Sequence, residues 1–356
     1  MSFRTALQDA LTRTRSQRLM EATRRIQAAL SGRTQAADEP GLSAHSKYPG
    51  KPVRPLAQVV QTLQKLKHSP FAFGKAGRTG SIEPEIVDGA QFLTRSFSCK
   101  AGSRSYKLYI PNYKPNHQRP LLIMLHGCKQ SPSDFAVGTR MNTLAETHGM
   151  LVAYPAQTQS ANPSACWNWF NPSHQGPDRG EPAIIAGLTE EIIMSHNIDR
   201  KKVFVAGLSA GGAMAVIMGE TYPELFSAVG VHSGLPYQSA SDVVSAFAAM
   251  RGDSSTTNAI PKLRTIVFHG DADGTVAPSN GARIVNGAAF SAADAEQVNG
   301  QYTRHVARDS RGRPLFEHWL LHGGGHAWSG GNSAGSYTDS NGPNASAEMI
   351  RFFFAS

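Results

Sequence analysis

The segment around Ser209 holds the residues whose types and spacing most directly suggest chemistry. Ser209 lies between Gly207 and Gly211 in the pattern G-x-S-x-G, directly after the apolar run Val203–Val205. Where this pattern joins a strand to a helix, it forms a sharp turn that exposes the serine hydroxyl, and the glycines let the backbone turn without Cβ clashes. The sequence predicts a nucleophile at Ser209, with the N–H of Ala210 facing a developing oxyanion. The alternative is an ordinary tight turn.

A serine is a weak nucleophile unless a base removes its proton, and the base must itself be oriented. Two pairs of side chains in the C-terminal part of the chain meet these needs. Asp271 and Asp273 follow the apolar run 266–268, and His322 and His326 follow the apolar run 319–321. Each segment is expected to place its polar residues just beyond the end of a strand. The order serine, aspartate, histidine is the one that α/β-hydrolases use.

The spacing within these segments favours one residue of each pair. The pattern H-G-x-x-D-x-x-V in the first turn makes Asp273 the acid and leaves Asp271 to cap the turn. His326 follows three glycines that allow a loop to carry it over Ser209, whereas His322 continues the strand and is expected to be structural. We therefore predict Asp273 and His326 as acid and base, with Asp271 and His322 as the alternatives.

A second oxyanion donor is expected in the loop that follows the apolar run 121–125. This loop begins with His126, Gly127 and Cys128, and its glycine allows the backbone to approach a reacting group closely. We predict that the N–H of Cys128 is the donor. The alternative is an ordinary turn at the end of a strand.

The segment Cys166–Phe170 is the other distinctive stretch, because three of its five residues are aromatic. Aromatic residues at this density form either a plug in the core or a wall of an apolar cleft. Trp328 lies two residues after His326, which favours the cleft. Trp167, Trp169 and Trp328 are therefore predicted to bind substrate.

The chain contains three cysteines, Cys99, Cys128 and Cys166, which is too few for a disulfide scaffold. Cys128 and Cys166 follow two strands that are expected to be neighbours, about 4.8 Å apart. We predict that they can form a disulfide in an oxidising compartment, with Cys99 left over; the alternative is two buried thiols. The spacings C-x-x-C and H-E-x-x-H are missing, so no metal site is expected, and this chemistry needs no cofactor.

The pattern of apolar residues predicts the elements that position these loops. Period-two alternation at 92–98 and 104–110 predicts an antiparallel hairpin at a sheet edge. Short apolar runs then alternate with helical patterns, which indicates a mostly parallel, doubly wound α/β sheet. The expected strands are 120–126, 151–155, 202–207, 226–231, 265–269 and 315–321, and the expected helices are 134–148, 181–197, 210–222 and 345–354.

Positive charge is concentrated in the N-terminal part of the chain. The 356 residues carry a net charge of +9, yet residues 1–80 hold 14 Lys and Arg against 4 Asp and Glu, and the rest holds 21 against 22. The near-neutral body argues against nucleic-acid binding. Residues 1–90 are expected to form a basic extension with two amphipathic helices, at 3–30 and 55–66, before a catalytic domain at 91–356.

The basic extension suits an anionic surface such as a granule, although a solvated arm or docking on the body are the alternatives. No apolar run is long enough to span a bilayer, so no transmembrane segment is expected. The first residues, Met1–Leu7, lack the basic segment and apolar core of a signal peptide.

Five spaced motifs together resemble the esterase family of poly(3-hydroxybutyrate) depolymerases, which is related to feruloyl and acetylxylan esterases. They are Leu125–Cys128, Cys166–Phe170, Gly207–Met214, Val231–Gly234 and Gly325–Trp328. The resemblance covers residues 91–356. It implies an α/β-hydrolase fold and a serine esterase that acts on a polyester, its oligomers or a related small ester.

The resemblance leaves three questions of function open. Many family members are secreted, so the location is either extracellular or, without a visible signal peptide, cytoplasmic. A feruloyl- or acetylxylan-type carboxylesterase is the alternative enzyme. A non-catalytic protein that binds granules through its basic extension is the alternative from another class, and the complete set of Ser209, Asp273 and His326 argues against it.

Overall fold

The computed structural model describes residues 82–113, 116–253, 260–285, 295–298 and 300–355. All of them belong to one compact unit, Ala72–Ser356. The extension predicted for residues 1–90 lies outside the described residues except for 82–90. No helix within the described ranges has the length and apolar character needed to cross a membrane.

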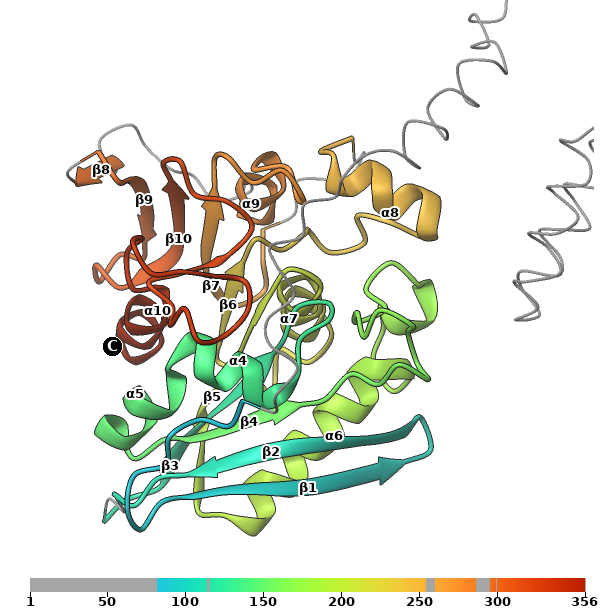
Figure 1. Ribbon diagram of the computed structural model, residues 1–356, viewed down its shortest axis with the longest axis vertical. Helices are drawn as coiled ribbons and strands as arrows, with labels where there is room; N and C mark the ends of the chain where they lie inside the picture. Colours follow the sequence, from blue (N-terminus) through green and yellow to red (C-terminus); the bar gives the residue numbers. More distant parts are fainter. Residues whose placement is uncertain (1–81, 114–115, 254–259, 286–294, 299, 356) are drawn as a thin grey trace, which may run out of the picture. The chain divides into compact units, whose positions relative to one another are not determined.

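A ten-stranded sheet runs through the described residues in the order β1-β2-β4-β3-β5-β6-β7-β10-β9-β8 (Figure 1). A separate pair of short strands, β11 and β12, follows the loop after β10. The strands span Gln91–Cys99 (β1), Gly102–Ile110 (β2), Arg119–Leu125 (β3), Leu151–Pro155 (β4), Ile198–Leu208 (β5), Ala228–His232 (β6), Arg264–Gly270 (β7), Ala295–Val298 (β8), Tyr302–Arg308 (β9), Pro314–Leu321 (β10), Trp328–Ser329 (β11) and Thr338–Asp339 (β12).

The central strands are parallel and the edges are antiparallel. Pairing is parallel from β4 through β3, β5, β6 and β7 to β10. At one edge β1 and β2 form the predicted hairpin, with Phe92 opposite Tyr109, and at the other edge β8 and β9 add antiparallel strands to β10. The strands β4 and β6 are buried throughout, as expected when helices cover both faces of a parallel sheet. The prediction of a mostly parallel α/β sheet is confirmed.

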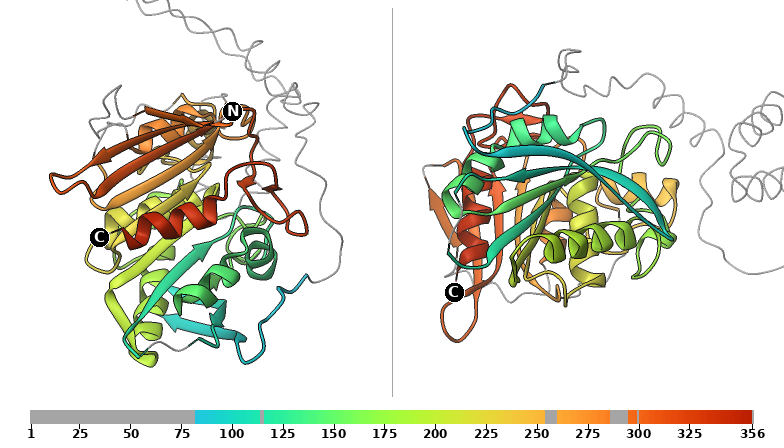
Figure 2. Two further views of the ribbon diagram at one scale, coloured as in Figure 1. Left: turned by 90° about the vertical axis from the view of Figure 1, so that its left-hand side faces the viewer. Right: turned by 90° about the horizontal axis from the view of Figure 1, so that it is seen from below.

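Helices cover both faces of this sheet. The helices α6 to α9 pack on one face and α4, α5 and α10 on the other, and Figure 2 shows α6 and α10 on opposite sides. The helices span Pro132–Thr139 (α4), Met141–His148 (α5), Gly180–Ser195 (α6), Ala210–Thr221 (α7), Val243–Met250 (α8), Ser279–Ile284 (α9) and Ala345–Phe354 (α10), with a 3₁₀ turn at Pro172–His174.

Successive residues of a central strand enter different cores, because side chains alternate across a sheet. In β3, Ile123 belongs to the core beneath α6 and α7, and Leu122 belongs to the core beneath α10. In β5 the ring of Phe204 stacks on Phe353 of α10, with centroids 4.7 Å apart. Both cores are apolar, so the sheet is held from two sides and its C-terminal edge is a firm base for loops.

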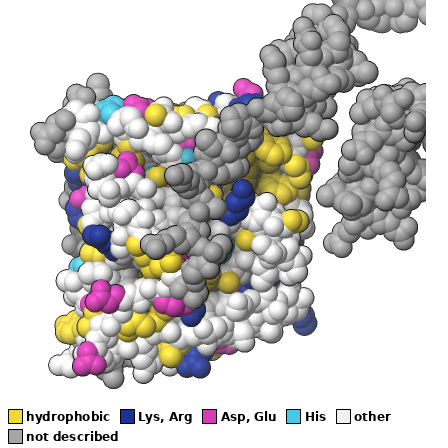
Figure 3. All heavy atoms as spheres, viewed as in Figure 1, with side chains coloured by type: hydrophobic (Ala, Val, Ile, Leu, Met, Phe, Trp, Pro, Cys, Tyr) yellow, Lys and Arg dark blue, Asp and Glu magenta, His cyan; other side chains and the backbone are white. Residues whose placement is uncertain are grey.

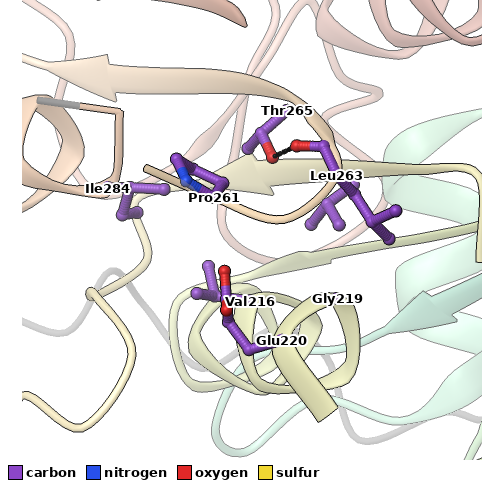
Figure 4. Close-up of a pocket in the computed structure, with 8 residues that line it drawn as sticks. Val216, Gly219, Glu220, Pro261, Leu263, Thr265 and Ile284 are labelled. Atoms are coloured by element: carbon purple, nitrogen blue, oxygen red, sulfur yellow. Dashed lines mark hydrogen bonds between the residues drawn. The ribbon is translucent and has the colours of Figure 1, made fainter. Parts of the chain in front are cut away.

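Helix α7 packs closely over β5 and β6. A Cβ atom at Gly219 would lie 2.6 Å from Val229 Cγ2, so a glycine at this position lets the helix approach β6. Figure 4 shows the C-terminal half of α7 facing the segment Pro261–Thr265. In that segment Thr265 Oγ1 donates to the Leu263 carbonyl at 2.9 Å. The hollow between them measures about 10 Å³, which is room for about one water and for no larger ligand.

The single helix predicted for 134–148 is in fact two. Arg140 adopts a left-handed conformation with φ of 53°, and its N–H donates to the Ala136 carbonyl, which closes α4 before α5 begins. The apolar spacing on either side of Arg140 is similar, so periodicity alone does not reveal the break. Helices α8 and α9 and strands β8 and β9 were not predicted. Their segments have weak patterns, and α9 and β8 are also short.

Candidate active site

Ser209 occupies the sharp turn between β5 and α7. Its φ of 57° and ψ of −120° lie outside the regions that a residue with a side chain normally adopts. Its N–H donates to the His232 carbonyl at 2.9 Å. A Cβ atom at Gly211 would lie 2.0 Å from the Leu125 carbonyl oxygen, so only glycine fits there. The chain thus holds Ser209 in a strained turn at the wall of a cavity, at the N-terminus of α7.

Asp273 and His326 meet through the loops that follow β7 and β10. His326 Nδ1 lies 2.8 Å from Asp273 Oδ2. Asp273 Oδ1 accepts the N–H groups of Thr275 and Val276, both at 2.9 Å. Because a carboxylate only accepts hydrogen bonds, His326 carries its proton on Nδ1 and leaves Nε2 free to act as a base. His326 and Ser209 line the same cavity, so an oriented imidazole and the predicted nucleophile share one site.

The Asp273 carboxylate is fully buried and stays ionised. Burial by itself would raise its pKa, but hydrogen bonds from His269 and His326 outweigh burial and hold the pKa of this carboxyl well below its usual range. His269 Nε2 lies 2.9 Å from the Val276 carbonyl and 3.4 Å from Asp273 Oδ2. His269 was not predicted as part of the site. The available signal was its position at the end of β7, four residues before Asp273.

The two alternative residues pair with each other and not with the predicted ones. His322 Nδ1 lies 3.0 Å from Asp271 Oδ2, and Asp271 Oδ1 accepts the N–H of Gly323 at 2.7 Å. Their side chains are 29% and 38% exposed, against 12% for His326. The same two loops therefore carry two Asp–His pairs, one beside Ser209 and one closer to solvent.

The loop after β3 lies against the turn that carries Ser209. A Cβ atom at Gly127 would be 3.6 Å from the Ser209 Cβ, and Cys128 and Ala210 both line the cavity. Cys128 and Cys166 are joined by a disulfide, with Cα atoms 4.3 Å apart, whereas Cys99 is a free, exposed thiol. The two residues whose backbone N–H groups are predicted to bind an oxyanion thus line the same cavity as Ser209.

Hydrogen bonds hold this loop from behind. The Gln157 N–H donates to His126 Nε2 at 3.0 Å, and Trp167 Nε1 donates to the His126 carbonyl at 3.1 Å. The Lys129 N–H donates to the Ser164 carbonyl at 2.9 Å. Burial lowers the pKa of His126, which keeps its Nε2 available as an acceptor. The loop after β3 and the aromatic segment therefore behave as one braced unit.

Glu181, at the start of α6, anchors the aromatic segment. Its side chain is almost fully buried, and its carboxylate accepts the Asn168 N–H and side-chain amide, both at 2.8 Å. Arg104 lies 3.2 Å away and Gln157 also donates to it. These partners satisfy a charge that would otherwise be costly to bury. The sequence shows no signal for this role, because the three partners come from three separate segments.

The cavity beside Ser209 has a volume of about 350 Å³, within the size range of small-molecule sites. Helix α8 supplies Val243, Ala246, Phe247 and Met250 to its lining. The remaining apolar lining comes from Trp169, Phe170, Leu208, Leu235 and Val276. The polar lining residues besides Ser209 and His326 are Lys129, Asn162, Ser164, Thr275 and Tyr337.

Only one of the three tryptophans predicted to bind substrate lines this cavity. Trp169 does so, next to Phe170. Trp167 is fully buried and bonds to the backbone of the loop after β3. Trp328 is also buried, where its Nε1 donates to Ser346 Oγ at 3.0 Å and its ring stacks on His232. The prediction is corrected for Trp167 and Trp328: each indole N–H finds its partner inside the core, so the ring stays there.

A serine on a strand-to-helix turn, an Asp–His pair and a mostly parallel sheet together define an α/β-hydrolase. The comparisons with known proteins agree. The family described as "Esterase PHB depolymerase" matches residues 104–307, which is more than half of the chain. The chain belongs to this family.

Relatives with two kinds of name are similar to this chain. It is 30% identical to a poly(3-hydroxyalkanoate) depolymerase C of Paucimonas lemoignei over 65% of this chain and 60% of the relative. It is 29% identical to a probable acetylxylan esterase A of Aspergillus fumigatus over 59% of this chain and 61% of the relative. The chain thus spans about three fifths of the length of these curated relatives.

Among solved structures, an acetyl xylan esterase from Aspergillus awamori superposes on this chain with a TM-score of 0.58. The match covers 74% of this chain and 98% of the esterase, at 21% sequence identity. At this identity the likeness is evidence for the fold.

Proposed function

We propose that the protein is a serine esterase that hydrolyses ester bonds of poly(3-hydroxybutyrate) or its oligomers. The observation that carries the proposal is the shared cavity of Ser209 and His326, with His326 Nδ1 bonded to Asp273 at 2.8 Å. Ser209 Oγ attacks the ester carbonyl while His326 Nε2 takes its proton. His326 then gives the proton to the leaving alcohol, and Asp273 orients the imidazole and stabilises its charged form.

The oxyanion of the tetrahedral intermediate is assigned to two backbone donors. In this proposal the N–H of Ala210, at the first residue of α7, and the N–H of Cys128 bind it. The braced loop after β3 supports this assignment, because a preorganised donor does not have to move as charge develops. Water attacks the acyl-enzyme in the second half of the reaction, with His326 again acting as base, and no cofactor takes part.

The shape and chemistry of the cavity support an apolar ester. Its lining is mainly aliphatic and aromatic, and two lining residues at its rim, Val243 and Phe247, are 55% and 48% exposed. Val244, next to them on α8, is 80% exposed. Figure 3 shows apolar side chains gathered on the surface over α8. A continuous apolar surface from rim to nucleophile suits a chain of short ester units better than a heavily hydroxylated sugar polymer.

A panel of four substrates tests the proposal. We expect hydroxybutyrate oligomers and amorphous polymer to be hydrolysed faster than methyl ferulate and acetylated xylan. The acetylxylan esterase relatives make xylan the informative competitor. If acetate is released from xylan faster than the polyester is hydrolysed, the substrate is acetylated xylan and not the polyester. If none of the four esters is hydrolysed, the protein is not an esterase.

The Ser209→Ala variant is the control for the panel. It should lose about 10⁴–10⁶-fold in kcat, as removal of a nucleophilic serine typically does, while its thermal unfolding stays that of the unmodified protein. Activity within tenfold of the unmodified protein, in the folded variant, would assign the nucleophile elsewhere.

A finer proposal concerns residues 1–80, whose 14 Lys and Arg against 4 Asp and Glu suit an anionic surface such as a granule. Binding to granules should then weaken as salt rises from about 0.05 to 0.5 M. A chain that begins at residue 82 should lose this binding and keep its rate on small esters. Equal binding by the two forms would contradict the proposal.

A further inference from the structure

The loops after β7 and β10 are joined twice, by two Asp–His pairs of similar geometry. Asp273 pairs with His326 at 2.8 Å, and Asp271 pairs with His322 at 3.0 Å. The chemistry proposed above uses only the first pair. The second pair lies at the base of the loop that carries His326, where β10 ends at Leu321.

Three glycines separate the two histidines, and they give this loop little support of its own. Gly323 has a φ of +71°, and among the described residues a Cβ atom at Gly323 or Gly325 would meet no atom within 4 Å. Gly324 alone is packed, against Leu321 and Gly270, and its carbonyl accepts the Ala272 N–H at 3.0 Å. Glycine has the largest conformational freedom of any residue. The position of His326 therefore depends on the hydrogen bonds of the loop and on the single close contact at Gly324.

Asp271 supplies two of these hydrogen bonds with one carboxylate. Oδ1 accepts the Gly323 N–H at 2.7 Å, and Oδ2 accepts from His322 Nδ1 at 3.0 Å. The Asp271 N–H donates in addition to the Leu321 carbonyl at 2.9 Å. The hydrogen bond from His322 lowers the pKa of Asp271, so the carboxylate is ionised at neutral pH. It fixes the first residues of the loop to the turn that contains Asp273.

The second nitrogen of His322 ties the pair to the sheet. His322 Nε2 lies 2.9 Å from Thr303 Oγ1, and Thr303 lies in β9 opposite Leu320 of β10. A hydroxyl both donates and accepts, so this bond persists whether His322 is neutral or charged. The network therefore links the β7 turn, the glycine loop and the edge of the sheet.

We propose that Asp271, His322 and Thr303 form a positioning network that holds the glycine loop so that His326 stays aligned with Ser209. The proposal rests on the esterase function proposed above. The partial exposure of Asp271 and His322 supports it, because an exposed pair of polar side chains contributes little to the free energy of unfolding. What such a pair can do is select one loop conformation, and the misplacement of a reacting group by about 1 Å can cost about 100-fold in rate.

The test compares Asp271→Ala with a matched control, Asp309→Ala. Asp309 lies in the turn at the other end of the β9–β10 hairpin, where its carboxylate accepts two backbone N–H groups, one more than that of Asp271, and one side chain, that of Arg313. Both variants remove the same kinds of bonds from an exposed turn. Their thermal unfolding should therefore change by similar amounts, and only Asp271→Ala should affect catalysis.

Two esters with different leaving groups separate positioning from general damage. p-Nitrophenolate departs from p-nitrophenyl butyrate without a proton, whereas the alcohol of ethyl butyrate needs the proton from His326. We expect Asp271→Ala to lower kcat/KM by about 10- to 100-fold on ethyl butyrate and by several-fold less on the p-nitrophenyl ester, through kcat and not KM. An equal loss on both esters, or a loss no larger than that of Asp309→Ala, would overturn the proposal.

Two His322 variants provide the rescue. His322→Ala removes both hydrogen bonds and should behave like Asp271→Ala. His322→Asn keeps an amide donor near the position of Nδ1, so it should recover most of the rate on ethyl butyrate. If His322→Asn hydrolyses ethyl butyrate no faster than His322→Ala, the proposed network is wrong. The proposed function has its own test, because the unmodified protein must hydrolyse both esters and Ser209→Ala neither.

Discussion

The two sides of the cavity are built differently. The side formed by residues 127–130 and 164–170, here called the braced wall, is held by the Cys128–Cys166 disulfide and by the bonds of His126 and Glu181. The side formed by α8, here called the apolar wall, presents Val243, Phe247 and Met250 to the cavity. The braced wall carries a predicted oxyanion donor, and the apolar wall carries no group predicted to take part in the chemistry.

This difference follows from what each wall has to do. A donor to an oxyanion is effective only if it is already in place when charge develops, which demands covalent and hydrogen-bonded support. Contacts with an apolar substrate are non-directional and scale with buried area, so they tolerate small shifts of a helix. Helix α8 is held by its own cap, in which Asp242 accepts the Ser245 N–H at 2.7 Å, and at its other end by Asn280 Nδ2, which donates to the Ala249 carbonyl at 2.8 Å. The covalent support is thus placed in the wall where geometry decides the rate.

The largest effect should come from the Asp273 carboxylate, which belongs to neither wall. We expect Asp273→Asn to lower kcat by about 10⁴-fold, through the wrong tautomer of His326 and the loss of a charge. Neither wall changes, so KM should stay within about twofold. Steady-state kinetics on p-nitrophenyl butyrate measures the effect. A loss smaller than that of Asp271→Ala would exchange the roles of the two aspartates.

Removal of the disulfide in the braced wall should have the second largest effect. Cys166→Ser removes a disulfide that closes a loop of 38 residues, for which the chain-entropy account gives a loss of about 4 kcal/mol in the free energy of unfolding. A fall in kcat should accompany it, because the Cys128 N–H loses its brace. Urea unfolding and kinetics measure both, with Cys99→Ser as the control. Unchanged kcat would show that the hydrogen bonds alone hold the donor.

We expect acid to destabilise the protein through His232, which is fully buried between the rings of Phe268 and Trp328. Burial is the main cause that lowers the pKa of His232 to about 3, and electrostatic interactions with His269 and His326 add to it. The unfolded chain, with a pKa of about 6.5, binds the proton more readily. Stability is therefore complete above about pH 6.5 and falls by about 1.4 kcal/mol for each pH unit below it, until about pH 3.

Urea unfolding between about pH 7 and pH 4 measures this slope. His232→Gln should reduce the slope, whereas His117→Gln should leave it unchanged because His117 is exposed. A slope equal in all three proteins would mean that other groups, such as buried His318, account for the acid sensitivity.

The smallest effect should come from the rim of the apolar wall. Val244 is 80% exposed and does not line the cavity, so Val244→Ser should leave the rate on p-nitrophenyl butyrate unchanged. Binding to a polyester film should weaken by about two- to tenfold, from the apolar area lost. Met194→Ser is the control, since Met194 is 76% exposed near the end of α6 and away from this rim. If both variants lose the same amount of film binding, the protein does not bind the film through the exposed side of α8.

Much of the fold could be predicted from the order of apolar runs. The edge hairpin, the buried strands and α10 are all found close to their predicted ranges, because each has a strong local period or a long apolar run. The break at Arg140 and the helix α8 were missed. The first depends on one left-handed residue and the second on a short helix, and neither changes the periodicity of its segment.

The candidate site shows the same division. The residue types and their places after strands predicted Ser209, Asp273 and His326, and the structure places Ser209 and His326 at one cavity with Asp273 beside the imidazole. Their roles remain predictions. The role given to Trp167 and Trp328 failed, because a loop full of aromatic residues packs inward as readily as outward and nothing local decides which.

The sequence by itself determined the class of sheet, the family and the set of polar residues at the strand ends, since these follow from local pattern and motif. Only the tertiary structure decided which aspartate pairs with which histidine. Asp271 and Asp273 are two residues apart, and His322 and His326 are four apart, so sequence allows either pairing. The pairing depends on the parallel register of β7 and β10 and on the path of a three-glycine loop. Contacts between segments about 50 residues apart determine both.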